Sequence, residues 1–431
     1  MFCFLHTMRQ LEMPAYTHKI FIITKRRGAK RDMAIVEINE REFAAFAYNH
    51  PNIHFCQTVN WGKFKSNYGW ETNYIALQKN NKIVAASMFL KKKVPIINKY
   101  IFYAGRGFLM DYNDHVTLKI FTREMKNYLK RQKGIFVKLD PYIIHMEHSG
   151  NYEIVENGVN NYKIIRTLKK FGYVHHGYTK GLTGAGAAKP RWEYRINLKE
   201  KSMEEIYQRF NKTTKRLLKK DSNKYVSVRE LQQKELGVFC KIEENTCNTK
   251  HFPYRGDSFF KNMYDELYKD SMIKVMVAEL DLDQYIHTLE TEATNDKKQY
   301  DTANLLTELK EERDKSGSKV VLASSLFITV GNEIVYFAGG SNRKYMKYKA
   351  QFLIQWEMIQ FAKKENYDYY NFGGISGDNS EKNPHYGLWR FKNNFGGEVT
   401  EFIGEFDLVI NKTFYFLYNA AYSLYSKWQT R

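Results

Sequence analysis

The sequence predicts a mixed α/β protein with two domains, and three observations support this fold class. The chain has 431 residues, which is well above the common domain size, so a single core is not expected. Hydrophobic residues make up 43% of the chain, enough to build cores and to exclude an intrinsically disordered protein. Alternating strand patterns and helical patterns follow one another along both halves.

The first half begins with residues 1–32, which are basic and show no sustained period. We expect this extension to be disordered or to precede the true start of translation, because a strand pattern starts just after Met33. Residues 33–190 form the first predicted domain. Helices are predicted there at 40–48, 116–131 and 162–171, and strands at 34–38, 84–90, 134–139 and 173–178.

The second predicted domain, residues 191–402, repeats this alternation. Helices are predicted at 203–219, 232–245, 258–267 and 350–365, and strands at 226–229, 273–279, 319–329, 333–338 and 369–372. A long polar loop is predicted after the last strand. The remaining residues, 403–431, are expected to pack on the first domain.

A mostly polar segment, residues 283–316, interrupts the second domain. Its few apolar residues lie three or four positions apart, which predicts a short antiparallel helical hairpin with a polar turn near 295–298. These apolar residues are Leu282, Ile286, Leu289, Ala293, Leu305 and Leu309. Two interpretations remain open: a solvated excursion that contributes little to the core, or a projecting arm that contacts RNA.

The charge of the chain points to acidic partners. Lys and Arg number 67 against 47 Asp and Glu, a formal net charge of +20. A nucleic acid, a phosphorylated small molecule or the anionic inner face of a membrane would match this charge, and an ordinary basic surface is the alternative. The four cysteines form no C-x-x-C pair and no H-E-x-x-H motif is present, so we expect neither a metal nor a cofactor. No stretch approaches the ~18–20 apolar residues of a membrane-spanning helix, and no cleavable signal follows the start.

A glycine-rich strand end at 371–377 leads to a segment, 385–392, that combines aromatic residues with cations. Such a pairing is suited to hold a phosphate or a developing oxyanion. This segment and several others, in their order and spacing from Met33 onward, resemble the FemABX family of aminoacyltransferases, which build peptidoglycan interpeptide bridges. The other segments are 57–65, 103–108 with Asp111, 137–141, 189–191, 212–220, Tyr254-Arg255 and 403–407.

The resemblance implies two acetyltransferase-like domains, with the helical arm inserted in the second. It also implies transfer of an amino acid from aminoacyl-tRNA to the amino group of a peptidoglycan precursor peptide. Glycine is the first expectation, with serine or alanine as alternatives. The expected partners are aminoacyl-tRNA and a UDP-linked or lipid-linked muropeptide precursor, with no cofactor. A cytoplasmic protein is expected, with contact at the inner membrane face and a homo-dimer or hetero-dimer with related members as further possibilities.

The resemblance also assigns site residues. The precursor diphosphate contacts fall on Lys65 and Arg255, and the strand-end aspartate, which would orient or deprotonate the incoming ammonium, falls on Asp140. The pair at the acceptor channel falls on Phe391 and Lys392, with Lys392 stabilising the tetrahedral oxyanion or the leaving ribose oxygen. The expected substrate-binding set also contains Trp61, Arg106 and Tyr254.

Simpler roles remain open for three of these residues. Lys65 could be a solvated helix lysine, Arg255 a surface salt-bridge partner and Asp140 a helix or turn cap. The sequence also departs from the family pattern, with Phe259 where a tyrosine is expected and Thr249 where many relatives carry arginine.

Two rival functions belong to different classes. An acetyl-CoA-dependent N-acetyltransferase is one, although its [QR]-x-x-G-x-[GA] pyrophosphate loop is not visible. A non-catalytic or immunity-type member that protects the cell wall against a lytic enzyme is the other.

Overall fold

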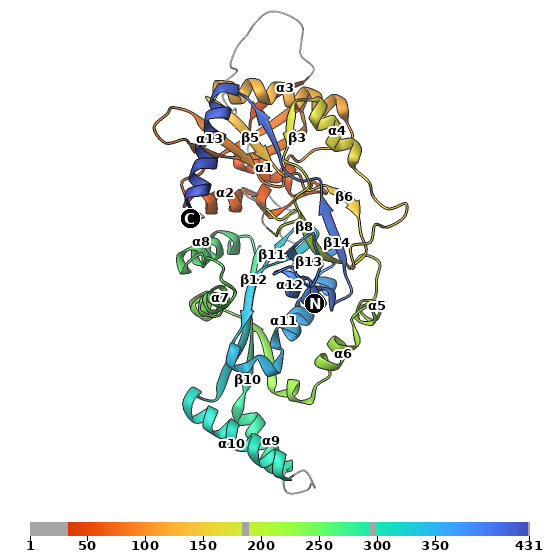
Figure 1. Ribbon diagram of the computed structural model, residues 1–431, viewed down its shortest axis with the longest axis vertical. Coiled ribbons are helices and arrows are strands. Elements are labelled where there is room, and N and C mark those ends of the chain that lie inside the picture. Colours follow the sequence, from red (N-terminus) through yellow and green to blue (C-terminus); the bar gives the residue numbers. More distant parts are fainter. Residues whose placement is uncertain (1–32, 183–188, 293–298, 430–431) are drawn as a thin grey trace, which may run out of the picture. The chain divides into compact units, whose positions relative to one another are not determined.

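Two β-sheets with helices on their faces organise the chain (Figure 1). The computed structural model describes residues 33–182, 189–292 and 299–429. The predicted extension at 1–32 and the polar turn near 295–298 lie outside these ranges. Both sheets belong to one unit that starts at Met33. The predicted mixed α/β class is confirmed, with strands and helices in alternation through both halves.

The first sheet has seven strands in the order β1-β2-β3-β4-β5-β15-β7. Their bounds are β1 Met33–Glu37, β2 Glu71–Lys79, β3 Lys82–Lys93, β4 Tyr100–Ala104, β5 Gly134–Leu139, β7 Tyr173–His175 and β15 Phe406–Val409. Only β4 and β5 run parallel; the other neighbours are antiparallel. The C-terminal strand β15 therefore separates β5 from β7.

The second sheet has eight strands in the order β6-β14-β8-β13-β12-β11-β10-β9. Their bounds are β6 Ile144–Glu147, β8 Trp192–Asn197, β9 Val226–Glu230, β10 Ile273–Asp281, β11 Lys319–Val330, β12 Glu333–Ser341, β13 Tyr369–Ile375 and β14 Glu398–Phe402. Only β12 and β13 run parallel. Each sheet thus contains one parallel pair among antiparallel strands.

Helices cover both faces of the first sheet. They are α1 Glu40–Ala47, α2 Val59–Ser66, α3 His115–Arg131, α4 Tyr162–Lys170 and α13 Lys412–Gln429. Side chains alternate between the faces of a strand. Ile75 and Leu77 of β2 pack in one cluster with α3 and α4, whereas Tyr74 and Ala76 pack in another with α1 and α2.

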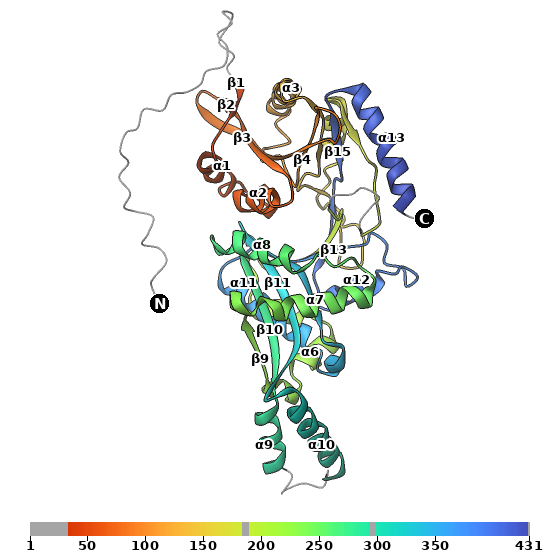
Figure 2. The ribbon, with the colours of Figure 1, turned by 90° about the vertical axis from the view of Figure 1, so that its left-hand side faces the viewer.

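The second sheet is covered in the same way. Its helices are α5 Met203–Gln208, α6 Lys212–Leu218, α7 Leu236–Lys250, α8 Asp257–Tyr268, α9 Leu282–Glu292, α10 Gln299–Ser316, α11 Ala350–Lys364 and α12 Tyr386–Asn393. Val275 and Val277 of β10 pack with α7 and α8, and Met276 and Ala278 pack with α11, so these helices lie on opposite faces (Figure 2). Among the residues that the structure describes, no helix is both long and apolar enough to cross a membrane.

One hydrophobic cluster joins the two sheets. Phe43 and Phe64, from α1 and α2, belong to the same buried cluster as Phe239 and Phe260, from α7 and α8. The rings of Phe64 and Phe259 meet edge to face with centroids 5.1 Å apart. The helices that carry Lys65 and follow Arg255 are therefore packed against each other by apolar burial.

The predicted helix at 203–219 is wrong as a single element. It is split into α5 and α6 because Asn211 interrupts it: the Asn211 side chain accepts the Thr214 N–H at 2.8 Å and so caps the start of α6. The Asn211 N–H itself donates to the carbonyl of Asn394. The spacing of apolar residues alone predicts one continuous helix here. The Asn211 side chain instead starts a second helix, because it satisfies a free backbone N–H of the first turn.

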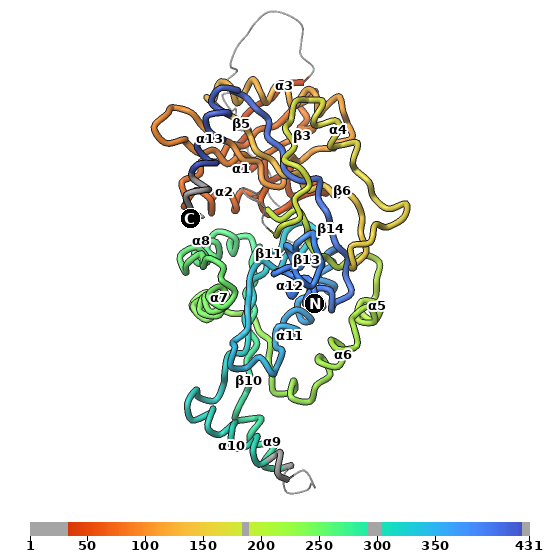
Figure 3. Tube along the Cα trace, in the orientation of Figure 1, coloured from red at the N-terminus to blue at the C-terminus, as the bar shows by residue number. Residues whose placement is uncertain are grey.

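The predicted helical hairpin is present as α9 and α10, which leave the sheet after β10 and return to β11 (Figure 3). Ion pairs Arg313–Asp283 and Lys310–Glu290 join the two antiparallel helices. The interpretation that the segment contributes little to the core is wrong at its base. Tyr285 and Leu309 are buried in the core of the second sheet, and Tyr285 stacks on Tyr225 at 4.1 Å.

Candidate functional site

Asp140 follows directly on β5 and is buried, with only 3% of its surface exposed. Its carboxylate accepts the Arg106 backbone N–H at 2.8 Å and the Tyr103 hydroxyl at 3.2 Å. Burial raises the Asp140 pKa to about 6, although the charge and the N–H of Arg106 oppose this shift. The carboxylate thus holds a backbone N–H of the turn that follows β4, and with this pKa it titrates in the range useful for moving a proton at neutral pH.

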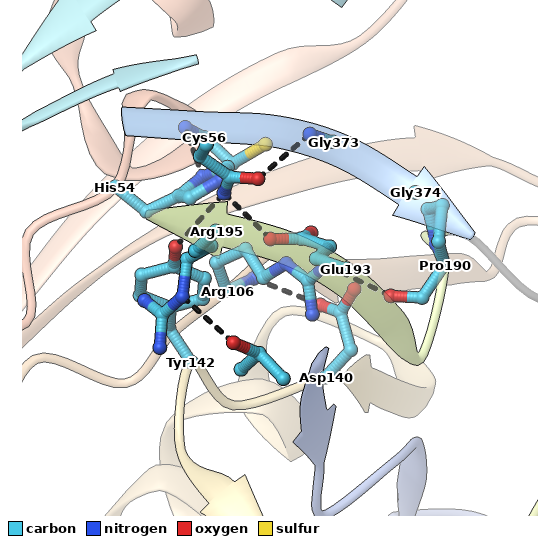
Figure 4. Close-up of polar contacts among 12 residues, drawn as sticks. His54, Cys56, Arg106, Asp140, Tyr142, Pro190, Glu193, Arg195, Gly373 and Gly374 are labelled. Carbon is cyan, nitrogen blue, oxygen red and sulfur yellow. Dashed lines mark hydrogen bonds and ion pairs between the residues drawn. The ribbon is translucent and has the colours of Figure 1, made fainter. Parts of the chain in front are cut away.

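The Arg106 side chain crosses from the first sheet to the second. Its Nη2 donates to Glu193 Oε1 of β8 at 2.6 Å and to the carbonyl of Pro190 at 2.9 Å (Figure 4). The guanidinium also lies over the rings of Phe402, at 4.5 Å, and Tyr142, at 5.5 Å. Arg106 was predicted to bind substrate, but in the structure its guanidinium binds Glu193, the Pro190 carbonyl and two aromatic rings of the protein itself.

The buried polar network continues beyond Glu193. The other Glu193 oxygen accepts Asn371 Nδ2 at 2.7 Å, and the Tyr142 hydroxyl donates to Glu333 at 2.7 Å. Glu333 lies 3.6 Å from Arg195, and burial raises the Glu333 pKa while Arg195 lowers it. This network fixes the two sheets at the level of Asp140, because an unpaired charge left there would be costly.

Several cations converge beside α2 with few carboxylates among them. The pKa of Lys65 is lowered, chiefly by burial and further by the neighbouring charges of Lys189, Lys92 and Arg255. Lys189 Nζ lies over the rings of Phe55, at 5.0 Å, and Trp61, at 5.1 Å. Like charges held this close favour an anionic ligand, which would relieve their mutual repulsion.

Arg255 is held by aromatic rings on two sides. Its guanidinium lies 5.4 Å from the Phe259 ring and 5.2 Å from the Phe337 ring, and the residue as a whole remains exposed to solvent. Enclosure by these rings lowers the Arg255 pKa, and Glu243 opposes that shift. Phe259, at the position where a tyrosine was expected, thus supplies a stacking face instead of a hydroxyl.

Tyr254, another expected substrate-binding residue, precedes Arg255 and uses its hydroxyl group in a local hydrogen bond. Its hydroxyl donates at 2.6 Å to Oδ1 of Asp257, the first residue of α8. The contact orders the turn that presents Arg255, so Tyr254 is positioned to support the cluster.

A cavity of about 380 Å³ opens next to Asp140. The network and the cation cluster both reach it, through Arg106 and Lys189 respectively. The other lining residues include Phe136, Lys138, His176, Arg191, Phe402, Glu405, Asp407, Tyr418, Asn419 and Tyr422. Lys138 and His176 both pair with Asp407 and lower its pKa, although burial raises it.

Lys392 lies on α12, so the predicted loop position is wrong. The helix forms because its aromatic residues pack: Phe391 meets Phe352 at 5.2 Å and Phe395 at 5.8 Å, which turns Phe391 toward the core of the second sheet. Lys392 is only 3% exposed, and Nζ donates to the carbonyls of Gly373, at 3.1 Å, and Gly374, at 2.6 Å.

Burial lowers the Lys392 pKa to about 7, with Glu193 opposing the shift. Both forms of the amine are therefore populated near neutral pH. Glu193, whose charge acts on Lys392, also binds the Arg106 side chain, and the Arg106 backbone N–H binds Asp140, so the two titrating groups are linked in part by hydrogen bonds and in part by electrostatics. Gly374 is required at its position because a Cβ there would lie 2.5 Å from Pro190.

The structure thus places Lys189 near Trp61, Lys65 and Asp140, with Arg255 near Lys65. Lys392 is held by the carbonyls of Gly373 and Gly374 on β13. Glu193 and Tyr142 were missed by sequence reasoning. Glu193 belongs to an unpredicted strand in which polar and apolar residues alternate, and a carboxylate on the buried face of that pattern was the available signal. The described parts of the chain contain no cluster of His, Cys, Asp and Glu that could hold a metal ion.

Comparison with known proteins bears on this site and on the fold. The model of the FemAB family matches residues 38–305 and 294–423. Aminoacyltransferase FemB of Staphylococcus epidermidis is 30% identical over 90% of this chain and 97% of its own. Aminoacyltransferase FemA of Staphylococcus epidermidis (strain ATCC 35984 / DSM 28319 / BCRC 17069 / CCUG 31568 / BM 3577 / RP62A) is also 30% identical, over 90% of this chain and 98% of its own.

Among solved structures, the crystal structure of FemX superimposes with a TM-score of 0.76 at 24% identity, covering 89% of this chain and 99% of that one. This likeness confirms the predicted fold class of two acetyltransferase-like domains. With the matched model spanning both sheets and the hairpin between β10 and β11, the chain belongs to the FemAB family.

Proposed function

We propose that this protein is an aminoacyltransferase that moves an amino acid from aminoacyl-tRNA to the amino group of a peptidoglycan precursor peptide. Glycine is the expected residue, with serine and alanine as the alternatives. Membership of the FemAB family and relatives named aminoacyltransferases support this reaction class. We place the reaction in the cytoplasm, where charged tRNA is available.

The observation that carries the proposal is the grouping of three cations beside a carboxyl group that titrates near neutral pH. The charges of Lys189 and Arg255 lie close enough to Lys65 to lower its pKa. The charge of Lys189 also acts on Asp140, whose pKa it lowers. A diphosphate-linked precursor would satisfy the cations, and its peptide amine would find a proton acceptor in Asp140.

The chemistry needs positioning more than activation, because an aminoacyl ester is already reactive. The precursor ammonium gives a proton to the Asp140 carboxylate, and the free amine attacks the ester carbonyl carbon to form the C–N bond. The carbonyl oxygen becomes an oxyanion, which the Lys392 ammonium stabilises. The C–O bond to the tRNA ribose then breaks, and the ribose oxygen takes the surplus proton of the attacking nitrogen and leaves as a hydroxyl, so that the new amide keeps one N–H. No covalent enzyme intermediate is required.

The test is transfer of label from glycyl-, seryl- and alanyl-tRNA onto UDP-linked and lipid-linked precursors, followed by mass spectrometry of the product. We expect one aminoacyl-tRNA to be used and Asp140→Asn to reduce transfer strongly. Acetyl-CoA is supplied in a parallel reaction. Acetylated precursor would support the acetyltransferase alternative, and no transfer from any donor would support the non-catalytic alternative.

A further inference from the structure

The loop between β3 and β4 presents an apolar tip to solvent. Ile96 is 105% exposed, and its backbone has a φ of 71°, a left-handed conformation that β-branched residues rarely adopt. Lys92, Lys93 and Lys99 flank this tip. A strained, fully exposed isoleucine among lysines costs free energy in water, so a partner that buries it would stabilise the loop.

The C-terminal helix α13 carries a second exposed apolar surface. Tyr415 and Tyr418 pack on Phe136 of β5 at 5.3 and 5.2 Å, which fixes one side of the helix on the first sheet. Leu417 and Leu424 lie seven positions apart, on another side, and are 54% and 71% exposed. Ala420 and Ala421 lie between them on the same stripe and are exposed as well.

These two surfaces are neighbours on one face of the first sheet. Lys99 Nζ lies 5.1 Å from the Phe414 ring, so the end of the loop touches the first turn of α13. The face is also free of negative charge along both segments, because residues 91–110 and 408–431 contain no aspartate or glutamate. The nearest carboxylate on the adjoining strand, Glu71, is paired with Lys91 at 3.1 Å. Apolar side chains framed mainly by lysines match a surface that is apolar inside and anionic at its edge.

We propose that the β3–β4 loop and the exposed stripe of α13 form a docking surface for an anionic lipid bilayer. Ile96 and Leu424 would enter the boundary between headgroups and acyl chains, while Lys92, Lys93 and Lys99 contact the phosphates. A nucleic acid would use the lysines but leave Ile96 in water. A second copy of the chain would bring its own lysines against these, so charge complementarity favours lipid.

The position of this surface also bears on which precursor is the acceptor, and this one step rests on the function proposed above. Lys92 packs on Trp70 at 5.2 Å and is near enough to Lys65 to lower its pKa. Docking would therefore place the cation cluster at the level of the lipid phosphates. A precursor whose diphosphate is attached to a lipid would be met there, so the lipid-linked form is the acceptor that this geometry favours.

The experiment is co-sedimentation of the full chain with vesicles of phosphatidylglycerol or of phosphatidylcholine, without tRNA or precursor. We expect binding to the anionic vesicles only, weakened by salt. Ile96→Asp and Leu424→Asp should each reduce the partition coefficient about tenfold or more, and Lys93→Gln about fivefold. Val116→Asp is the matched control, because Val116 is 64% exposed on α3, which covers the opposite face of the sheet.

The proposal is overturned if wild-type protein ignores anionic vesicles, or if Val116→Asp weakens binding as much as Ile96→Asp does. Light scattering of the same variants tests the alternative partner, since a dimer that Ile96→Asp dissociates would make this face a subunit interface. Thermal melts show whether each variant is folded, and aspartate suits the left-handed position at least as well as isoleucine. Because no catalytic component is present, failure here leaves the proposed transfer reaction untouched.

Discussion

Replacement of Lys392 by methionine separates the charge of this side chain from its volume. The Lys392 pKa of about 7 means that about nine-tenths of the amines are charged at pH 6 and about one-tenth at pH 8. If the ammonium stabilises the oxyanion, its loss should lower kcat by about a hundredfold where it is fully charged, as for one oxyanion donor. The precursor KM should change only a few-fold.

The ratio of wild-type to variant kcat should therefore depend on pH. We expect it to be about a hundred at pH 6 and to fall to about ten at pH 8, as wild-type Lys392 loses its proton. The ratio cancels the titration of the acceptor amine and of Asp140, which both enzymes share. Single-turnover transfer from saturating charged tRNA is the assay, and Lys363→Met is the control, since Lys363 also donates to a carbonyl, that of Leu198 at 3.2 Å.

The same substitution should change the pH dependence of stability. Burial lowers the Lys392 pKa from 10.5 to about 7, equivalent to ~5 kcal/mol, so the unfolded chain binds more protons between these values. Wild-type stability should rise with pH in this window, by about 3 kcal/mol between pH 7 and pH 9.5, relative to the variant.

The kinetic experiment has a clear refuting outcome. A ratio of wild-type to variant kcat that is constant with pH, or an effect of Lys392→Met on KM alone, would refute the role of Lys392 in the transition state.

The remaining predictions concern binding, proton transfer and the hairpin. Lys65→Ala or Arg255→Ala should raise the precursor KM about tenfold without lowering the melting temperature, and unchanged KM in both would remove the diphosphate assignment. Asp140→Asn should lower kcat about a hundredfold and abolish the loss of activity as pH falls through about 6, where wild-type Asp140 becomes protonated; a surviving acidic limb in the pH–rate profile would contradict this. Replacing residues 290–302 by a Gly-Ser turn should spare the melting temperature and raise the KM for aminoacyl-tRNA, whereas an equal KM would show that the tip does not touch tRNA.

Local patterns predicted those elements whose signals lie within the element itself. The run 134–139 is β5 to the residue, and the predicted helix at 350–365 is α11 with one residue fewer. Strands such as β6 and β15 escaped because each is short and gains its stability from partners far along the chain: β6 pairs with β14, and β15 with β5 and β7.

The site divides along the same line. The residue types at Lys65, Asp140 and Arg255 were available from the sequence, through the family resemblance. Their environment was not, because burial and neighbouring charge depend on tertiary packing. Lys392 shows the difference most clearly: its identity was predicted, but its place on a helix and its pKa of about 7 follow from the way that α12 packs on β13.

The interleaving of β15 into the first sheet has a consequence for synthesis of the chain. Its residues, Phe406–Val409, leave the ribosome after those of every other strand that the structure describes, and until then β5 has an open edge and β7 has no neighbour in its sheet. An unpaired strand edge invites association with other chains. The nascent protein must therefore keep this edge shielded until β15 emerges, and a chain truncated before Phe406 would be prone to aggregation rather than form a smaller enzyme.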